Sequence, residues 1–231
     1  MFYGYDMQSL VYLLPGMLLS LLAQWYVKST VQRYLEVPTS GRRTGAQIAE
    51  QLLRAAGIRD VTVELHPGFL SDHYDPNAKA LRLSEANYHG TSVAAAGIAA
   101  HEAGHAIQHA SGYHMMKLRQ ALIFPARFGS QLGMIVAGVG IAMHAFNLAW
   151  IGVLLFSAVF LFELVTVPVE INASRRAGDK LLELGLVTAG EAQGVRSVLN
   201  AAALTYIAAM ISTLLTLLSF IMRIQNSRER E

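Results

Sequence analysis

Two histidines four residues apart carry the most specific chemistry in this chain. They stand in the segment His101-Glu-Ala-Gly-His105. On a helix, residues at this spacing project from the same face, one turn apart, so both imidazoles can reach one Zn²⁺. Glu102 lies between them in sequence and could act as a general base on a water molecule. Since chance gives such a pattern in about one sequence in a hundred, the segment predicts a catalytic zinc site.

A catalytic zinc site needs a third protein ligand and one open position for water. The chain contains no cysteine, so this ligand must be a histidine or a carboxylate. The candidates along the chain are His109, His114, Glu163, Glu170 and Asp179. His109 shares the helical face of the pair, but a ligand one turn farther along cannot curl back to a tetrahedral centre. Glu163 falls in an apolar run that suggests a depth away from the zinc, whereas Glu170 follows Pro168 near the end of that run. The residues alone leave the choice open.

Long apolar runs predict the helices that would hold these candidate ligands in place. Hydrophobic residues make up 53% of the 231 residues and charged residues only 15%, against about a quarter in soluble proteins. Uncharged runs at 10–27, 128–162 and 201–222 predict four transmembrane helices. The middle run is too long for one straight helix, so it predicts two antiparallel spans, at about 122–144 and 147–167, with Arg127 near an end. Each span suits a hydrocarbon core about 30 Å thick. The polar break at 144–147 predicts a turn, and the lack of a cleavage site after the first run predicts an uncleaved span.

The basic residues predict which side of the membrane holds the motif. One side of the four-span arrangement carries Lys28, Arg33, Arg42, Arg43, Lys117, Arg119, Arg175, Arg176 and Lys180. The positive-inside rule assigns this side to the cytoplasm. Arg223, Arg228 and Arg230 would face outward and are outnumbered. We therefore expect a multi-pass protein of the cell membrane with a cytoplasmic active site.

The polar stretch between the first two spans predicts a small α+β region. Residues 44–56 form an amphipathic pattern typical of a helix, and 60–65 and 80–84 alternate as half-buried strands do. Turn-forming residues separate the two strands. Thr91 or Ser92 could then cap the helix that carries the histidine pair.

Three segments extend this pattern, namely Asp72-His-Tyr-Asp-Pro76, Leu81-Arg-Leu-Ser-Glu-Ala-Asn-Tyr88 and Gly97-Ile-Ala-Ala-His-Glu-Ala-Gly-His-Ala-Ile-Gln108. These segments, together with the length of the chain and the layout of its spans, resemble the YugP-like family of membrane zinc metallopeptidases. The resemblance covers nearly the whole chain. The chain is more distantly similar to the CAAX prenyl protease and heat-shock membrane peptidases, of gluzincin type. In that group, a later Glu-any-any-Ala-Asp segment supplies a zinc-binding glutamate.

The matching segment in this chain is Glu170-Ile-Asn-Ala-Ser174, so the resemblance implies that Glu170 is the third zinc ligand. Ser174 replaces the aspartate that orients a zinc histidine in the distant group. A serine can still form a hydrogen bond, and Asn172 or Asp179 could take over the role.

The expected fold is a mainly α membrane protein, with about four transmembrane helices and a small α+β gluzincin-like zinc peptidase domain. Its predicted parts are a first transmembrane helix (1–27), a cytoplasmic α+β region with the motif helix (28–118), a transmembrane hairpin (119–167), cytoplasmic helices with the third ligand (168–200), a last transmembrane helix (201–223) and a tail (224–231).

The predicted activity is hydrolysis of peptide bonds by an integral-membrane zinc metalloprotease, an endopeptidase that acts on membrane-associated polypeptides. Zinc bound by His101, His105 and Glu170 would activate water, with Glu102 as general base. Arg175 or Arg176 could stabilise the oxyanion. The strand at 80–84 could pair with extended substrate as an edge strand, or simply with its own sheet.

Other interpretations fit the sequence less well. A non-catalytic membrane scaffold with a structural or vestigial zinc site would have no use for Glu102. A site-2-type intramembrane protease would carry the motif inside a span and a later Asp-Gly pair, which is absent. The net charge of +2 gives no basis for a nucleic-acid partner. Asp72, His73 and Asp75 could suggest a second metal site, but a turn with Asx hydrogen bonds explains them more simply.

Overall fold

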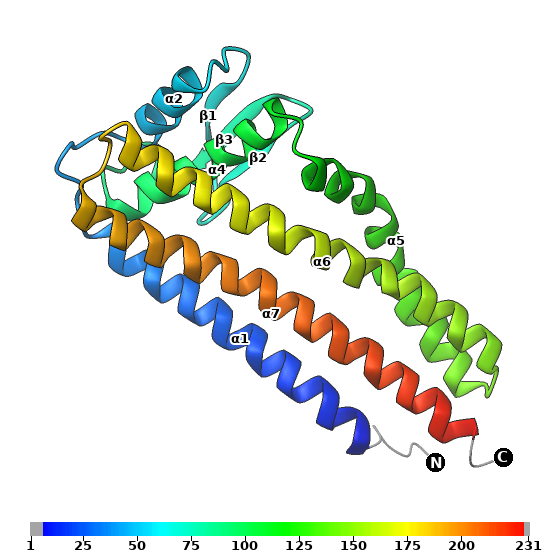
Figure 1. Cartoon of the computed structure of the whole chain (residues 1–231). Helices are drawn as coiled ribbons and strands as arrows, with labels where there is room; N and C mark the ends of the chain where they lie inside the picture. Colours follow the sequence, from blue (N-terminus) through cyan, green and yellow to red (C-terminus); the bar gives the residue numbers. More distant parts are fainter. Residues whose placement is uncertain (1–6, 229–231) are drawn as a thin grey trace. The chain divides into compact units, whose positions relative to one another are not determined.

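The computed structural model describes residues 7–228 (Figure 1). Its elements in chain order are α1 (Met7–Leu35), α2 (Gly45–Ala55), β1 (Thr62–His66), β2 (His73–Asp75), β3 (Ala80–Ser84), α3 (Glu85–Tyr88), α4 (Val93–Ala110), α5 (His114–Ala142), α6 (Phe146–Glu183) and α7 (Ala189–Arg228). These residues fall into two compact units. We call them the helical unit (7–24, 117–167 and 205–228) and the mixed unit (25–116 and 168–204).

Within residues 7–228, four helices are long and apolar enough to cross a membrane: α1 from Leu10, α5, α6 and α7. They confirm the mainly α fold with about four spanning helices that the uncharged runs predict. Two of them extend well past those runs. At 1.5 Å per residue, the 38 residues of α6 measure about 57 Å, nearly twice a hydrocarbon core of about 30 Å. The helical parts that continue beyond the apolar runs of α6 and α7 belong to the mixed unit.

In the helical unit, α5 and α6 form a tight antiparallel hairpin. The chain turns at residues 143–145, where His144 has a φ of 52°, so the predicted polar turn is confirmed. A Cβ atom added at Gly140 would lie 2.3 Å from the backbone nitrogen of Ala149, and one at Gly152 would lie 2.1 Å from that of Ala137. Only glycine permits such a close approach, which is a common way to pack helices in lipid. Large apolar side chains such as Leu154 remain exposed on this unit, as a lipid-facing surface would require.

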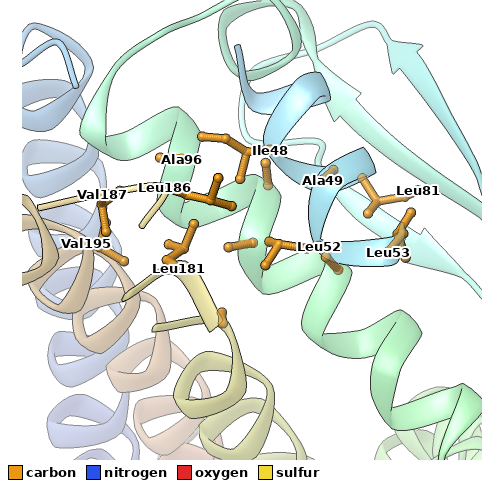
Figure 2. Close-up of a cluster of buried hydrophobic side chains, with 14 of the residues drawn as sticks. Ile48, Ala49, Leu52, Leu53, Leu81, Ala96, Leu181, Leu186, Val187 and Val195 are labelled. Carbon is orange, nitrogen blue, oxygen red and sulfur yellow. The ribbon is translucent and has the colours of Figure 1, made fainter. Parts of the chain in front are cut away.

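The mixed unit has its own hydrophobic core (Figure 2). Helix α2 begins with a capping box, in which the hydroxyl of Thr44 accepts from the backbone of Gln47 and the Gln47 side chain accepts from the backbone of Thr44. Its apolar face buries Ile48, Leu52 and Leu53, as the spacing predicts. Figure 2 shows these side chains beside Leu81 of β3 and Leu181 of α6.

A three-stranded sheet in the order β1-β3-β2 covers part of this core. Strand β1 is parallel to β3, and β2 is antiparallel to it. Of the two possibilities for residues 80–84, pairing within the protein's own sheet is the one observed, because β3 is central and both of its edges are paired. Strand β2 occupies the second edge. It escapes prediction from sequence because its three residues lie among turn-forming ones.

Candidate metal centre

Helix α4 presents the histidine pair. The Ser92 hydroxyl accepts a hydrogen bond of 3.1 Å from the backbone N–H of Ala95 and caps the helix start. The following turns are rich in small buried residues: Ala94, Ala95, Ala96, Ala99, Ala100, Ala103 and Ala106. Such a helix can approach its neighbours closely on several sides. The side chains of His101 and His105 leave it on one face, with ring centroids 4.7 Å apart.

Gly104 fixes the distance between α4 and α6. A Cβ atom at this position would lie 2.7 Å from the carbonyl oxygen of Ala173 and would collide with the α6 backbone. The glycine inside the motif therefore lets α6 lie directly against the histidine face. This contact places Glu170, three residues before Ala173, opposite the two imidazoles.

His101, His105 and Glu170 form a compact cluster. Their ligand atoms all lie within 4.8 Å of one another. The Oε2 atom of Glu170 is 3.1 Å from Nε2 of His101 and 3.3 Å from Nε2 of His105. All three side chains are almost completely shielded from solvent, with side-chain exposures of 12%, 9% and 2%, respectively.

Gln108 sets the tautomer of His105. The fully buried amide nitrogen of Gln108 donates to the carbonyl oxygen of Val169 at 2.8 Å, and a carbonyl can only accept. The amide oxygen of Gln108 therefore faces Nδ1 of His105, at 3.0 Å. Nδ1 must carry the proton, which leaves a lone pair on Nε2 when the ring is neutral. Because Nε2 is the atom that faces Glu170, the ring is oriented as a metal ligand.

Ser174 and Asn172 complete the surroundings. The Ser174 hydroxyl lies 3.1 Å from Nδ1 of His101, so the serine that replaces aspartate still contacts a histidine of the pair. Asn172 reaches the other histidine indirectly, since its side-chain oxygen accepts from Gln108 at 3.0 Å and from Nε of Arg176 at 2.8 Å. The Arg176 guanidinium also lies over the ring of Tyr113.

The chemistry of these atoms fits a divalent metal ion. With the proton of His105 on Nδ1, its Nε2 lone pair faces the carboxylate oxygen of Glu170 at 3.3 Å, and two such electron-rich atoms attract a proton or a bound cation between them. Two imidazoles and one carboxylate are also a ligand set that zinc uses in catalytic sites. The cluster could therefore hold Zn²⁺ and leave a position open for water.

Glu102 lies next to the cluster in a buried position, with an exposure of 7%. Burial raises the pKa of its carboxyl above the ordinary value, against the opposing effect of His101 and His105. In His105, burial lowers the imidazole pKa, but the hydrogen bonds with Glu170 and Gln108 and the negative charges of Glu170 and Glu102 together outweigh it, so the net shift of the pKa is upward. Among the described residues, none holds the Glu102 carboxylate by a hydrogen bond.

The other sequence candidates lie elsewhere. Nδ1 of His109 forms a hydrogen bond of 2.8 Å with the Tyr74 hydroxyl. His114 is exposed at the start of α5, and Glu163 belongs to the helical unit. Asp179 is exposed on α6. The carboxylate of Asp75 accepts from the backbone of Asn77 and Ala78, which is the Asx turn that the sequence suggests.

Gln108 is the residue near the cluster to which the sequence assigns no role. Its spacing could have indicated a contact with His105, because a side chain three residues after His105 lies on the same helical face. Its partners on α6 could not be identified without the tertiary contact.

Comparison with known proteins agrees with this geometry. Residues 9–225 match a family model described as "putative neutral zinc metallopeptidase". The chain is also 42% identical over 211 residues to the "putative membrane protease YugP" of Bacillus subtilis (strain 168), covering 91% of this chain and 94% of the relative. The chain belongs to this zinc metallopeptidase family. No solved structure matches it.

Family membership supports the YugP-like resemblance and the coarser functional expectations. The family is one of zinc peptidases, so zinc and a polypeptide substrate are implied. The four apolar helices and the name of the relative indicate a membrane protein.

Proposed function

We propose that this protein is a zinc-dependent membrane endopeptidase that cleaves polypeptides at the cytoplasmic face of the cell membrane. The convergence of His101, His105 and Glu170 on one point is the observation that carries the proposal. These three residues would hold Zn²⁺. The proposed domain boundaries follow the sequence prediction, with residues 28–118 and 168–200 on the cytoplasmic side.

A bound zinc ion would polarise the scissile carbonyl and make a neighbouring water more acidic. The residues of the chain supply the rest of the reaction. Glu102 takes a proton from the attacking water, whose oxygen adds to the carbonyl carbon. The same carboxyl then gives the proton to the amine nitrogen as the C–N bond breaks. Gln108 and Ser174 hold the imidazoles in orientation throughout.

Two observations favour this proposal over the alternatives. A structural zinc site would be closed by four ligands and would need no buried carboxylate beside it, so Glu102 argues against a scaffold. A site-2-type protease would carry the motif within a span, but α4 is not among the four helices apolar enough to cross a membrane.

Replacing Glu102 by glutamine tests the mechanism directly. Glutamine keeps the size of the side chain but cannot take up a proton, so peptide hydrolysis should fall by about 10²–10⁴-fold. Zinc content should stay the same, because Glu102 is not one of the proposed ligands. Hydrolysis is measured with fluorogenic peptides on detergent-purified protein, and zinc by elemental analysis.

Glu85→Gln is the matched control, since Glu85 is an exposed glutamate on α3. It should retain both activity and zinc. If the Glu102→Gln protein cleaved as fast as the wild type, the general-base assignment would be wrong. If wild-type protein bound zinc but cleaved no peptide, the scaffold alternative would be favoured.

A further inference from the structure

A polar pocket lies between α6 and α7 in the mixed unit. Its volume is about 450 Å³. Its lining includes Arg175 and Asp179 from α6 and Arg196, Leu199 and Ala203 from α7. A short connection at 184–188 joins the two helices, which run antiparallel on either side of the pocket (Figure 1). The pocket is therefore a groove along a helical hairpin.

The polarity of this groove changes along the hairpin. Arg175 and Arg196 lie at the same level, each about two turns from the connection. Farther from the connection, Ile171 lines the groove about one turn beyond Arg175, and Ala203 lines it about two turns beyond Arg196. Beyond Arg196, α7 has no Asp, Glu, Lys or Arg until Arg223. The arginines thus lie where the polar end of the hairpin meets the apolar run of α7. Toward that run, the lining on α6 and α7 is apolar except for Ser174 and Asn200.

The two arginines are available for a ligand. Among the described residues, neither Arg175 nor Arg196 forms a hydrogen bond or an ion pair with another side chain. Together with Asp179, they give the groove a formal charge of +1, which matches the single negative charge of a phosphodiester. Guanidinium groups are well suited to bind phosphate oxygens in pairs.

We propose that this groove binds the phosphodiester headgroup of a membrane phospholipid, with Arg175 and Arg196 as the phosphate ligands. The apolar side chains of Ile171 and Ala203 would contact the first part of the acyl chains. A free anion would gain nothing from this apolar end, so the polarity of the groove favours a lipid.

The groove also contacts the candidate metal centre. Ser174 lines the groove, and its hydroxyl lies 3.1 Å from Nδ1 of His101. A lipid in the groove would therefore lie one residue away from the cluster, and would anchor this part of the mixed unit at the membrane surface.

A second pocket in the mixed unit provides a matched control. It has a volume of about 550 Å³ and is also lined by two arginines, Arg54 and Arg59. Arg54, however, is paired with Glu50 at 3.1 Å. The lining comes from α2, the following segment and the start of β1, and it includes no residue of a helix long enough to span a membrane. This pocket has the arginines but lacks the apolar run.

Native mass spectrometry of the detergent-purified full chain, titrated with dioleoyl phosphatidylglycerol, tests the proposal. The wild type should retain one lipid preferentially. Since two charge-assisted hydrogen bonds are lost, Arg175→Gln/Arg196→Gln should bind it at least about tenfold more weakly. Arg54→Gln/Arg59→Gln should bind it as the wild type does. Zinc content, measured on the same samples, reports separately on the metal centre.

Other outcomes would overturn the assignment. Equal binding by all three proteins would exclude the groove as the lipid site. Displacement of the lipid by inorganic phosphate at equal concentration would indicate a simple anion site. Displacement by a peptide with an acidic end would assign the groove to substrate. A photoactivatable phosphatidylglycerol needs no variant, and its crosslinks to the wild type should fall within residues 171–179 and 196–203.

Discussion

At the residue scale, Glu170 decides whether the histidine pair is a complete metal site. Glu170→Ala removes the carboxylate that lies 3.1 Å and 3.3 Å from the two imidazoles. With only two ligands left, zinc should fall from about one ion per chain to a small fraction of that value. A metal chelator should lower the unfolding temperature of the wild type but not of the variant, because only the wild type gains stability from zinc.

Glu163→Ala is the control for this experiment, since Glu163 is another glutamate of α6 but belongs to the helical unit. It should keep its zinc. Full zinc occupancy in the Glu170→Ala protein would redirect the search for the third ligand to Glu163, His109 or Asp179.

Gln108 should matter almost as much as a ligand. Gln108→Ala removes the acceptor that holds Nδ1–H of His105, and it leaves the carbonyl of Val169 without this donor. Loss of such a supporting group typically weakens metal binding by about 10–100-fold. Zinc affinity, measured by competition with a chromogenic chelator, checks this value.

Gln193→Ala, on the exposed side of α7, should leave zinc affinity unchanged. An equal affinity in the Gln108→Ala protein would mean that the packing of α4 alone orients His105.

At the element scale, the contact between α4 and α6 determines the site. Gly104→Ala would bring a methyl group to 2.7 Å from the carbonyl oxygen of Ala173. The helices must then separate, and overpacking of this kind costs about 1–3 kcal/mol. We expect lower thermal stability and weaker zinc binding, although alanine is intrinsically the better helix former.

Gly178→Ala, also in a helix, meets no atom within 4 Å and serves as the control. It should be neutral or slightly stabilising. A Gly104→Ala protein with wild-type stability and zinc affinity would show that α6 does not need this close approach.

At the scale of the whole molecule, the orientation in the membrane is the main prediction. The chain has no natural cysteine, so single cysteines can report accessibility. Asn77→Cys lies in the turn between β2 and β3, and Met143→Cys lies in the turn between α5 and α6. With a cytoplasmic active site, a membrane-impermeant maleimide added to intact cells should label Met143→Cys and spare Asn77→Cys.

Permeabilised cells provide the control, because both cysteines should then react. The opposite labelling pattern in intact cells would place the metal centre outside the cytoplasm. Such a result would also mean that Arg223, Arg228 and Arg230 outweigh the other basic residues.

The sequence determined by itself the features that depend on neighbouring residues. The spacing of His101 and His105 places them on one face of any helix, and long uncharged runs predict spanning helices whatever they pack against. The cap at Ser92 and the turn at 144–147 are equally local.

Only the tertiary structure decided the features that join distant segments. It brought Glu170 to the two imidazoles, linked Gln108 to the backbone of α6, and placed β3 between two other strands. The physical reason is that such contacts depend on how closely two elements approach. At the metal centre this distance is set by the absence of a side chain at Gly104, and no local pattern in the sequence reveals what that glycine faces.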